Sequence, residues 1–410
     1  MGFTEKLQKY AELAVVAGVG LEPGQRLLVR APVETASLAR EIARAAYRAG
    51  ARLVDVLWDD DAVKLARVLG APEGSYQEIS AYHEALLHSG ERNDAVLSIR
   101  ADDPDLYRDA DPAVVSEIIT AQQTYLRPYM AKITGPAVNW GLISAPIPSW
   151  AQRVYPDASP DEAMERLWDA IFAMVRIDRP DPVAAWEEHL DALRARRETL
   201  NAKRFTALHF TSPGTDLTVG LPEAHRWHGG RMTTQGGIPF VPNLPTEEVF
   251  TLPHKDRVDG VVRATKPLSY QGTFMDGFEM EFEAGKVVRY SATTGEQHLA
   301  NILGTDEGAG RLGEVALVPV SSPVSQQDTL FFNTLYDENA SCHIALGKSY
   351  RFTLEGGDAM TDDEALAAGG NDSLVHIDCM VGSGEMDVDG ITADGRSEPI
   401  MRAGEWALDV

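Results

Sequence analysis

Apolar and polar positions in the first half of the chain follow two periods in turn, and this predicts alternating helices and strands. Helical spacing of apolar side chains is found over residues 3–19 and again near 35–49. Short, mainly apolar runs predict strands, and helical segments continue after the second run to about residue 88. These predicted strands are residues 26–30, 53–58 and 95–99. Strands that alternate with helices favour an α/β fold with a parallel sheet.

The pattern changes near residue 204. Residues 112–131 and 160–203 are mainly helical, and Pro180-Asp181-Pro182 interrupts the second stretch. From Phe205 onward, short strands such as 216–219 and 260–264 alternate with glycine-rich turns. We therefore expect an α/β N-terminal domain over residues 1–203, followed by a mixed α+β, strand-rich domain over residues 204–410.

Composition agrees with a globular protein of two domains. A chain of 410 residues exceeds the size at which a single core usually stops growing, and 44% hydrophobic with 24% charged residues is ordinary for soluble proteins. No stretch approaches the roughly 18 apolar residues of a membrane span, and the N-terminus has no apolar signal segment. The only cysteines are Cys342 and Cys379, too few for a disulfide framework. These features predict a cytoplasmic protein without a membrane partner.

Charge excludes another class of partner. The net charge is −25, with 62 acidic against 37 basic residues. Such a chain repels a phosphate backbone, so we expect no nucleic-acid partner.

Three segments resemble familiar motifs, but their context or spacing does not fit. Gly308–Gly313 matches a dinucleotide fingerprint in letters, but it leads into a strand rather than a helix. Gly347-Lys348-Ser349 lacks the first glycine of a phosphate-binding loop, because Cys342 stands there. His83 and His88 are five residues apart, which turns them away from each other on a helix. Nucleotide binding and a helical zinc motif are therefore not supported.

A histidine and an aspartate share one face of a predicted strand. In the apolar run 374–381, the period of a strand places His376 and Asp378 together and Ile377 and Cys379 on the opposite face. An imidazole beside a carboxylate can share a metal ion. On its own, however, such a pair is more often an exposed surface pair than a metal site.

A second candidate pair is His343 and Tyr350. They are seven residues apart, so they share a face if the segment 337–350 is helical. Gly347 argues against a continuous helix. The ordinary explanation is a core histidine and a tyrosine at the edge of the core, and this spacing by itself does not displace it.

Carboxylates occur in two apolar settings. Glu314 opens the strand-like run 313–318, and Glu247 and Glu248 lie between Pro245 and Pro253. A carboxylate drawn into an apolar environment needs a partner, and a metal ion is one that fits. For the adjacent pair, the period of a strand sends one side chain inward and the other outward. At most one of the two is therefore a ligand, and the pattern alone does not say which.

Four ordered motifs carry a resemblance to a known family. They are Pro-Thr-Glu-Glu-Val-Phe-Thr at 245–251, Thr-Asp-Glu-Gly-Ala at 305–309 with Gly-Glu-Val-Ala-Leu-Val at 313–318, Asp-Glu-Asn-Ala-Ser-Cys-His at 337–343, and Asn-Asp-Ser-Leu-Val-His-Ile-Asp at 371–378. With the opening Phe-Thr-Glu-Lys-Leu and the run 214–221, the sequence resembles the thermophilic metallo-aminopeptidases, the family of aminopeptidase T, aminopeptidase S and PepS. The resemblance extends over nearly the whole chain.

The resemblance implies a site, an activity and an assembly. Carried over residue by residue, it implies that two divalent metal ions are held in a catalytic domain by Glu248, Glu314, His343, His376 and Asp378. It also implies that Tyr350 is a nearby catalytic side chain, that the substrates are peptides with a free N-terminus, and that the protein is a homodimer.

The chemistry of these residues agrees with that activity. Carboxylates and imidazoles without thiolates suit zinc, cobalt or manganese. In such a site the metal ions activate a water molecule and polarise the scissile carbonyl, and a neutral tyrosine can donate a hydrogen bond to the oxyanion. The sequence therefore predicts a metal-dependent aminopeptidase. The alternatives are a hydrolase of another amide or ester, and a non-catalytic α/β binding protein with a closed metal site.

Overall fold

The computed structural model describes residues 1–270 and 273–408, and the chain forms two compact units. Unit 1 contains Met1–His189 and Arg231–Pro245, and unit 2 contains Leu190–Gly230 and Thr246–Val410. Helices and several sheets make this a mixed α/β protein. The domain boundary expected near residue 204 stays a prediction.

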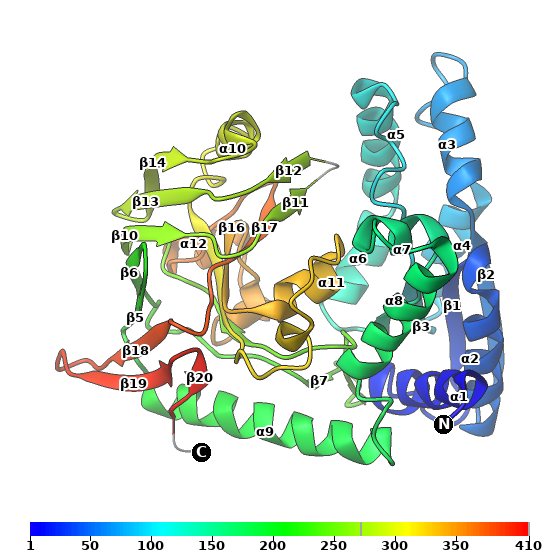
Figure 1. Ribbon diagram of the computed structural model, residues 1–410, viewed down its shortest axis with the longest axis horizontal. Coiled ribbons are helices and arrows are strands. Elements are labelled where there is room, and N and C mark those ends of the chain that lie inside the picture. The colour runs from blue at the N-terminus through cyan, green and yellow to red at the C-terminus, as the bar shows by residue number, and fades with distance from the viewer. Residues whose placement is uncertain (271–272, 409–410) are drawn as a thin grey trace. The chain divides into compact units, whose positions relative to one another are not determined.

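Unit 1 is built on a parallel sheet of four strands in the order β2-β1-β3-β4. These strands are β1 (Arg26–Pro32), β2 (Leu53–Asp59), β3 (Ala95–Arg100) and β4 (Trp140–Ser144). The three strands predicted from apolar runs are confirmed, as is their parallel arrangement (Figure 1). The fourth was missed, because Gly141 interrupts its short run of apolar residues.

The helices of unit 1 flank this sheet, as connections between parallel strands require. On one face, Leu28 and Val96 pack against Leu86 of helix α4 (Ala81–Glu91) and Tyr129 of helix α6 (Arg127–Thr134). Elsewhere, the buried hydroxyl of Tyr10 donates a hydrogen bond of 2.9 Å to the Ser144 carbonyl at the end of β4. The helical elements are α1 (Phe3–Leu13), a π-helical turn (Ala14–Gly18), a 3₁₀ turn (Val33–Thr35), α2 (Ala36–Arg48), α3 (Asp61–Gly70), α4 (Ala81–Glu91), α5 (Pro112–Tyr125), α6 (Arg127–Thr134), α7 (Pro148–Val154) and α8 (Pro160–Met174). The returning segment 231–245 adds the short hairpin of β7 (Met232–Thr233) and β8 (Pro239–Phe240).

The chain enters unit 2 within helix α9 (Pro182–Lys203), and unit 2 contains two larger sheets. The first has eight strands in the order β14-β13-β10-β6-β5-β18-β19-β20, and all its pairs are antiparallel. Its strands are β5 (Ala207–Ser212), β6 (Thr215–Gly220), β10 (Val258–Arg263), β13 (Glu279–Glu283), β14 (Lys286–Ser291), β18 (Asp387–Ile391), β19 (Ser397–Arg402) and β20 (Glu405–Trp406).

The second large sheet of unit 2 has four antiparallel strands in the order β17-β16-β15-β9. They are β9 (Val249–Thr251), β15 (Leu312–Leu317), β16 (His343–Gly347) and β17 (His376–Met380). The remaining elements of unit 2 are the hairpin of β11 (Leu268–Tyr270) and β12 (Thr273–Met275), the helices α10 (Glu296–Leu303), α11 (Thr334–Asp337) and α12 (Asp362–Ala367), and 3₁₀ turns at Ser325–Gln327, Glu338–Ala340, Arg351–Thr353 and Gly357–Ala359.

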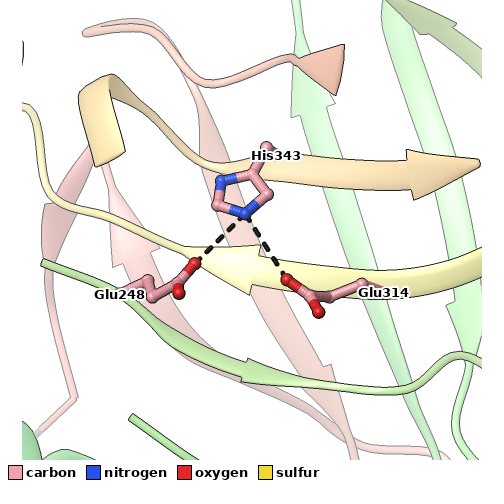
Figure 2. A group of neighbouring side chains, drawn as sticks. All are labelled: Glu248, Glu314 and His343. Atoms are coloured by element: carbon pink, nitrogen blue, oxygen red, sulfur yellow. Dashed lines mark ion pairs between the residues drawn. The ribbon is translucent and has the colours of Figure 1, made fainter. Parts of the chain in front are cut away.

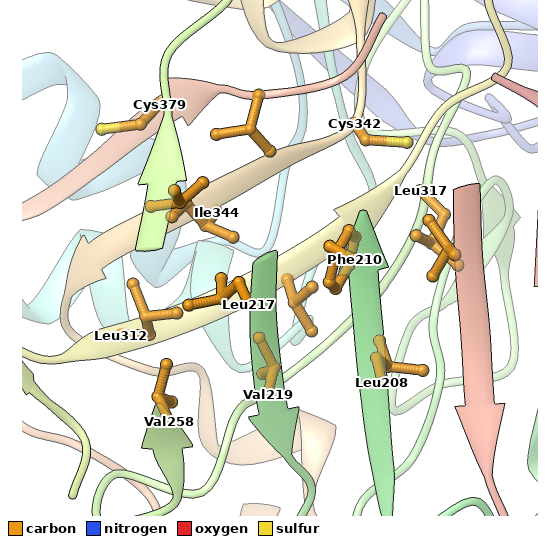
Figure 3. Packing of buried hydrophobic residues seen from close by; sticks show 14 of the residues in the cluster. Leu208, Phe210, Leu217, Val219, Val258, Leu312, Leu317, Cys342, Ile344 and Cys379 are labelled. Atoms are coloured by element: carbon orange, nitrogen blue, oxygen red, sulfur yellow. The ribbon is translucent and has the colours of Figure 1, made fainter. Parts of the chain in front are cut away.

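One face of the four-stranded sheet packs on the eight-stranded sheet and forms the core of unit 2 (Figure 3). Alternate residues of its strands point into this core, among them Val315, Leu317, Ile344, Ile377 and Cys379. They meet apolar residues of the larger sheet, among them Leu208, Phe210, Leu217, Val219 and Val258. Because successive side chains of a strand point to opposite faces, the intervening residues of β15, β16 and β17 lie together on the other face.

Within residues 1–270 and 273–408, no helix combines the length and the apolar character needed to cross a membrane.

Candidate metal centre

The five residues predicted as metal ligands lie together in unit 2, on the face of the four-stranded sheet that points away from its core. Glu314 is on β15, His343 begins β16, and His376 and Asp378 are on β17. Glu248 directly precedes β9. His376 and Asp378 share one face of β17, as predicted. Ile377 and Cys379, which alternate with them along the strand, point into the core on the opposite face.

The first group consists of Glu248, Glu314 and His343, whose ligand atoms all lie within 4.8 Å of one another (Figure 2). Nε2 of His343 is 3.1 Å from Oε2 of Glu248 and 3.6 Å from Oε1 of Glu314. All three side chains are almost completely buried. Two carboxylates thus converge on one imidazole nitrogen in a site with little water.

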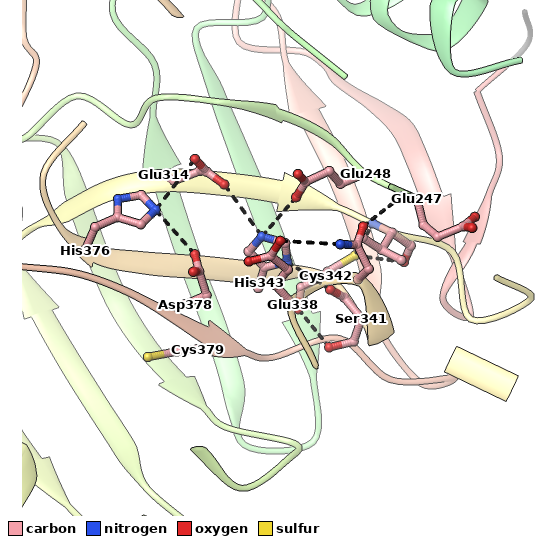
Figure 4. A network of polar contacts seen from close by, with 12 residues as sticks. Glu247, Glu248, Glu314, Glu338, Ser341, Cys342, His343, His376, Asp378 and Cys379 are labelled. Carbon is pink, nitrogen blue, oxygen red and sulfur yellow. Dashed lines mark hydrogen bonds and ion pairs between the residues drawn. The ribbon is translucent and has the colours of Figure 1, made fainter. Parts of the chain in front are cut away.

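The second group consists of Glu314, His376 and Asp378, whose ligand atoms also all lie within 4.8 Å of one another (Figure 4). Nε2 of His376 is 3.5 Å from Oδ1 of Asp378 and 3.9 Å from Oε2 of Glu314. Glu314 therefore belongs to both groups. One of its oxygens faces His343 and the other faces His376.

Both imidazoles are held by the backbone through their other nitrogen. Nδ1 of His343 is 3.1 Å from the Ser341 carbonyl oxygen, and Nδ1 of His376 is 2.7 Å from that of Lys348. A carbonyl oxygen can only accept, so each Nδ1 donates and, in the neutral ring, Nε2 keeps its lone pair. This is the arrangement of metal-binding histidines in general, because the second hydrogen bond fixes both the tautomer and the orientation of the ring.

The surroundings also fit cations. Oε2 of Glu248 and Oδ1 of Asp378 are buried, and in the described part of the chain each meets a histidine Nε2 rather than a fixed hydrogen-bond donor. When the rings are neutral, these oxygens therefore need a cation. Between the candidate ligands the sheet carries only small residues, since Ala316 pairs with His343 and Ala345 with Asp378. The donor set and the small size of these alanines therefore fit divalent metal ions.

A β-bulge aims Glu314 into the site. The register between β15 and β16 shifts between Leu312 and Glu314, so Gly313 is the extra residue. A Cβ atom at Gly313 would lie 2.3 Å from the Lys348 carbonyl oxygen, and only glycine fits there. Bulges are common next to functional sites because they turn a side chain out of the regular pleat.

Glu247 and Glu248 are both buried, with exposed fractions of 2% and 8%. The expectation that one of them faces outward is therefore wrong, because the segment before β9 is covered by other parts of unit 2. The two side chains still point in different directions (Figure 4). Glu248 faces His343, whereas the charge of Glu247 acts on Arg196. The backbone N–H of Glu247 donates to Oδ1 of Asn339 at 2.7 Å, which holds this segment in place.

Comparison with known proteins shows which family the chain resembles. The thermophilic metalloprotease (M29) family matches residues 3–406. The chain is 47% identical to Aminopeptidase 2 of Geobacillus stearothermophilus over 99% of this chain and 98% of that protein. It is 44% identical to Aminopeptidase T of Thermus thermophilus over 99% of both chains. The solved structure of wild-type AmpT from Thermus thermophilus superimposes with a TM-score of 0.93, covering 99% of this chain and 100% of that one, at 44% identity.

The chain belongs to the thermophilic metalloprotease family. The family resemblance predicted from the four motifs is confirmed, and so is the predicted class of enzyme, a metallo-aminopeptidase and hence a hydrolase. Membership of a metalloprotease family implies a divalent metal cofactor, in agreement with the two groups of candidate ligands.

Tyr350 of this metalloprotease lies beside the second group, but not for the reason that its spacing suggested. The segment 337–350 is not one helix, because His343–Gly347 forms the inner strand β16 and Tyr350 follows it in extended conformation. The Tyr350 ring contacts the His376 ring, with 4.8 Å between centroids. Burial, with the nearby carboxylates of Glu314 and Asp378, raises the pKa of Tyr350 well above its ordinary value. The phenol therefore keeps its proton and can donate it in a hydrogen bond.

Glu338 is a further acidic residue at the site, and sequence reasoning missed it. It lies in the 3₁₀ turn before β16, next to His343 in Figure 4. Burial and the charges of Asp378, Glu248 and Glu314 raise its pKa well above the ordinary value. Its only sequence signal is its place in the motif Asp-Glu-Asn-Ala-Ser-Cys-His.

The carboxylates of the metalloprotease strongly attract protons to the two histidines. For His376, burial alone would lower the pKa, but Asp378 and Glu314 outweigh burial and raise the pKa to about 10. Burial opposes protonation of His343 as well, but contacts with Glu248 and Glu314 raise its pKa well above normal. Burial raises the pKa of Glu314, whereas His376 outweighs burial and lowers the pKa of Asp378. In the metal-free site, protons on the two histidines therefore balance the negative charge that a bound cation would otherwise balance.

Proposed function

We propose that this protein is an aminopeptidase with a dinuclear metal site, and that unit 2 is its strand-rich catalytic domain. The candidate ligands are Glu248, Glu314, His343, His376 and Asp378. The observation that carries the proposal is the position of Glu314, whose two oxygens face the histidines of two separate groups. A carboxylate in this position would supply ligand oxygens to both groups.

The donor set favours zinc, cobalt or manganese, because it mixes imidazole nitrogens with carboxylate oxygens and contains no thiolate. With Glu338 included, the carboxylates outnumber the two imidazoles, so the site has an excess of negative charge for divalent cations to balance. When bound, such ions lower the pKa of water and polarise a carbonyl group.

The protein's own residues supply the remaining steps. The Tyr350 hydroxyl, which stays protonated, donates a hydrogen bond to the oxyanion that develops at the scissile carbonyl. A carboxylate oxygen of Glu338 accepts the proton that the attacking water loses, and it then passes this proton to the departing amine. Burial beside the other carboxylates raises the pKa of Glu338, which favours its holding the proton between the two transfers.

The charge of the protein favours substrates with a free amino terminus. A net charge of −25 gives a negative potential that attracts an ammonium group, and the similar proteins of Geobacillus and Thermus are named aminopeptidases. We further propose a homodimer, as the family resemblance implies. A reducing, cytoplasmic setting is supported by the free and buried thiols of Cys342 and Cys379.

A pair of substrates tests the aminopeptidase proposal. The metal-loaded protein should release the first residue of a short peptide, and acetylation of the amino terminus should lower kcat/KM by roughly 10²-fold or more, because a buried charge contact is lost. Release of the N-terminal residue is measured by chromatography. Equal cleavage of both peptides, or cleavage within the chain, would instead indicate a hydrolase of another kind.

Replacement of Tyr350 by phenylalanine tests its role as oxyanion donor. Tyr350→Phe keeps the ring and removes only the hydroxyl, so we expect kcat to fall by roughly 10²–10³ while KM changes less. Bound metal, measured on the same sample, should be unchanged. Normal turnover would remove Tyr350 from the mechanism, and loss of metal would show that it supports the site instead.

A further inference from the structure

Tyr350 is the first ring of an aromatic cluster that extends away from the candidate ligands. Its ring stacks on that of Phe352, with 5.4 Å between centroids and 14° between planes. The Tyr350 ring also contacts His376, at 4.8 Å. The plane of the phenol is therefore set by a candidate metal ligand and by Phe352.

Phe352 is held in turn by two further rings. Phe250 of β9 meets it edge to face, at 6.2 Å and 83°. His228 meets it edge to face, at 5.1 Å and 77°. Aromatic pairs prefer such stacked and edge-to-face arrangements, so these contacts favour a single orientation of the Phe352 ring.

The segment 225–228 ties this cluster to the sheet that carries the ligands. The N–H of His228 donates to the Phe250 carbonyl at 2.8 Å, and the N–H of Phe250 donates back at 2.9 Å. On the other side, Arg226 N–H donates to the Thr353 carbonyl at 2.8 Å. The segment therefore bridges β9 and the stretch of chain that contains Phe352.

The His228 side chain adds a direct link to Phe352. Its ring hydrogen-bonds to the backbone of Phe352, and since its buried Nε2 has no partner in the described part of the chain, the bond is made by Nδ1. Burial lowers the pKa of His228 to about 4, so the ring is neutral near pH 7. A neutral ring whose Nδ1 faces a carbonyl donates its single N–H there.

We propose that Phe352 and His228 are positioning residues for Tyr350: His228 fixes Phe352, and Phe352 fixes the plane of the phenol so that its hydroxyl meets the oxyanion. This inference rests on the proposed catalytic role of Tyr350. Neither Phe352 nor His228 needs to touch the substrate. Their effect should reach the reaction only through the Tyr350 hydroxyl, which makes the inference testable by combining substitutions.

The test compares wild type, Tyr350→Phe, Phe352→Leu and the double variant, all loaded with the same metal. Phe352→Leu should lower kcat by roughly 10- to 100-fold, because a small misplacement of a catalytic group has effects of this size. KM and bound metal should change little. In the Tyr350→Phe background, Phe352→Leu should change kcat by less than about threefold, since the hydroxyl that it positions is already absent.

Conservative variants separate positioning from general support of the fold. Phe352→Tyr keeps a ring for stacking and should retain most of kcat. His228→Leu removes the N–H donor and should lower kcat in the same direction as Phe352→Leu, whereas His228→Asn keeps a donor and should recover part of it. Phe282→Leu is a matched control, because Phe282 is a fully buried core residue of the same unit without a place in this cluster. It should lower the melting temperature but leave kcat unchanged.

The outcomes distinguish the two proposals. Equal effects of Phe352→Leu in both backgrounds, or a normal kcat in both Phe352→Leu and His228→Leu, would overturn the positioning role while Tyr350 remains catalytic. Normal turnover of Tyr350→Phe itself would refute the proposed role of Tyr350, and with it this inference. If Phe352→Leu does not fold, the His228 variants decide, because they leave the Phe352 ring in place.

Discussion

Glu314→Ala is expected to lose bound metal and to reduce peptidase activity by far more than about 10²-fold, since even residues that only support metal ligands contribute 10- to 100-fold. The reason is the position of this carboxylate in both groups of candidate ligands. Its removal takes an oxygen from each group and leaves His343 and His376 without the acid between them. Metal content per chain and kcat/KM are measured on the same preparation.

The fold should survive this substitution. Burial raises the pKa of Glu314 in the metal-free site, so its charged form is costly there, and the uncharged alanine removes this cost. Circular dichroism of the metal-free variant checks this.

Glu247→Ala is the matched control, because Glu247 is also buried in the same unit but its side chain points away from the histidines (Figure 4). It should keep both metal and most activity, whereas Glu248→Ala should resemble Glu314→Ala. An inactive Glu247→Ala beside an active Glu248→Ala would invert the assignment of the ligand.

Removal of metal by a chelator is expected to abolish activity, and zinc, cobalt or manganese should restore it. Metal uptake near pH 8 should release protons, because His376, with a pKa of about 10 in the metal-free site, is protonated there and must become neutral to bind. Calorimetric titrations in two buffers of different ionisation enthalpy measure this release. His376→Asn should release fewer protons. Full activity in protein shown to contain no metal would end the metal hypothesis.

The raised pKa of His376 also affects the stability of the metal-free protein. A histidine whose pKa is raised in the folded state stabilises the fold fully below its ordinary pKa of 6.5, and this contribution is lost as the pH rises through about 10. The raised pKa of Glu314 acts in the same direction, because the folded state again binds more protons. The melting temperature of chelator-treated protein should therefore fall between pH 7 and pH 10, and bound metal should reduce the fall.

Much of the fold follows from local patterns, and the exceptions have physical causes. The strands β1, β2 and β3 were predictable because each is a short, mainly apolar run that alternates with helical segments, the pattern of a parallel sheet. The segment around His343 was not, because β16 is buried on both faces and its short apolar run does not distinguish a strand from a helix. Tyr350 and His343 belong to the same site because β16 pairs with β17, whose His376 contacts the Tyr350 ring. Helical spacing plays no part.

The candidate site was predictable only in part for a related reason. The alternation in His376-Ile377-Asp378 already separates two faces, and this is visible in the sequence. That Glu314 lies between two histidines depends on the pairing of β15 with β16 and β16 with β17, which joins residues far apart along the chain. Glu338, Phe352 and His228 have no local signal of this kind, because their neighbours come from other segments.

The division of the four-stranded sheet into a ligand face and a core face restricts how the gene can change in length. Deletion of a single codon within β17 would shift the alternation by one position. His376 or Asp378 would then enter the apolar core, and Ile377 or Cys379 would take its place beside Glu314. A change of two codons would keep each side chain on its face of the sheet but move it by about 7 Å along the strand. Insertions and deletions should therefore be rare inside these strands and confined to the turns that connect them.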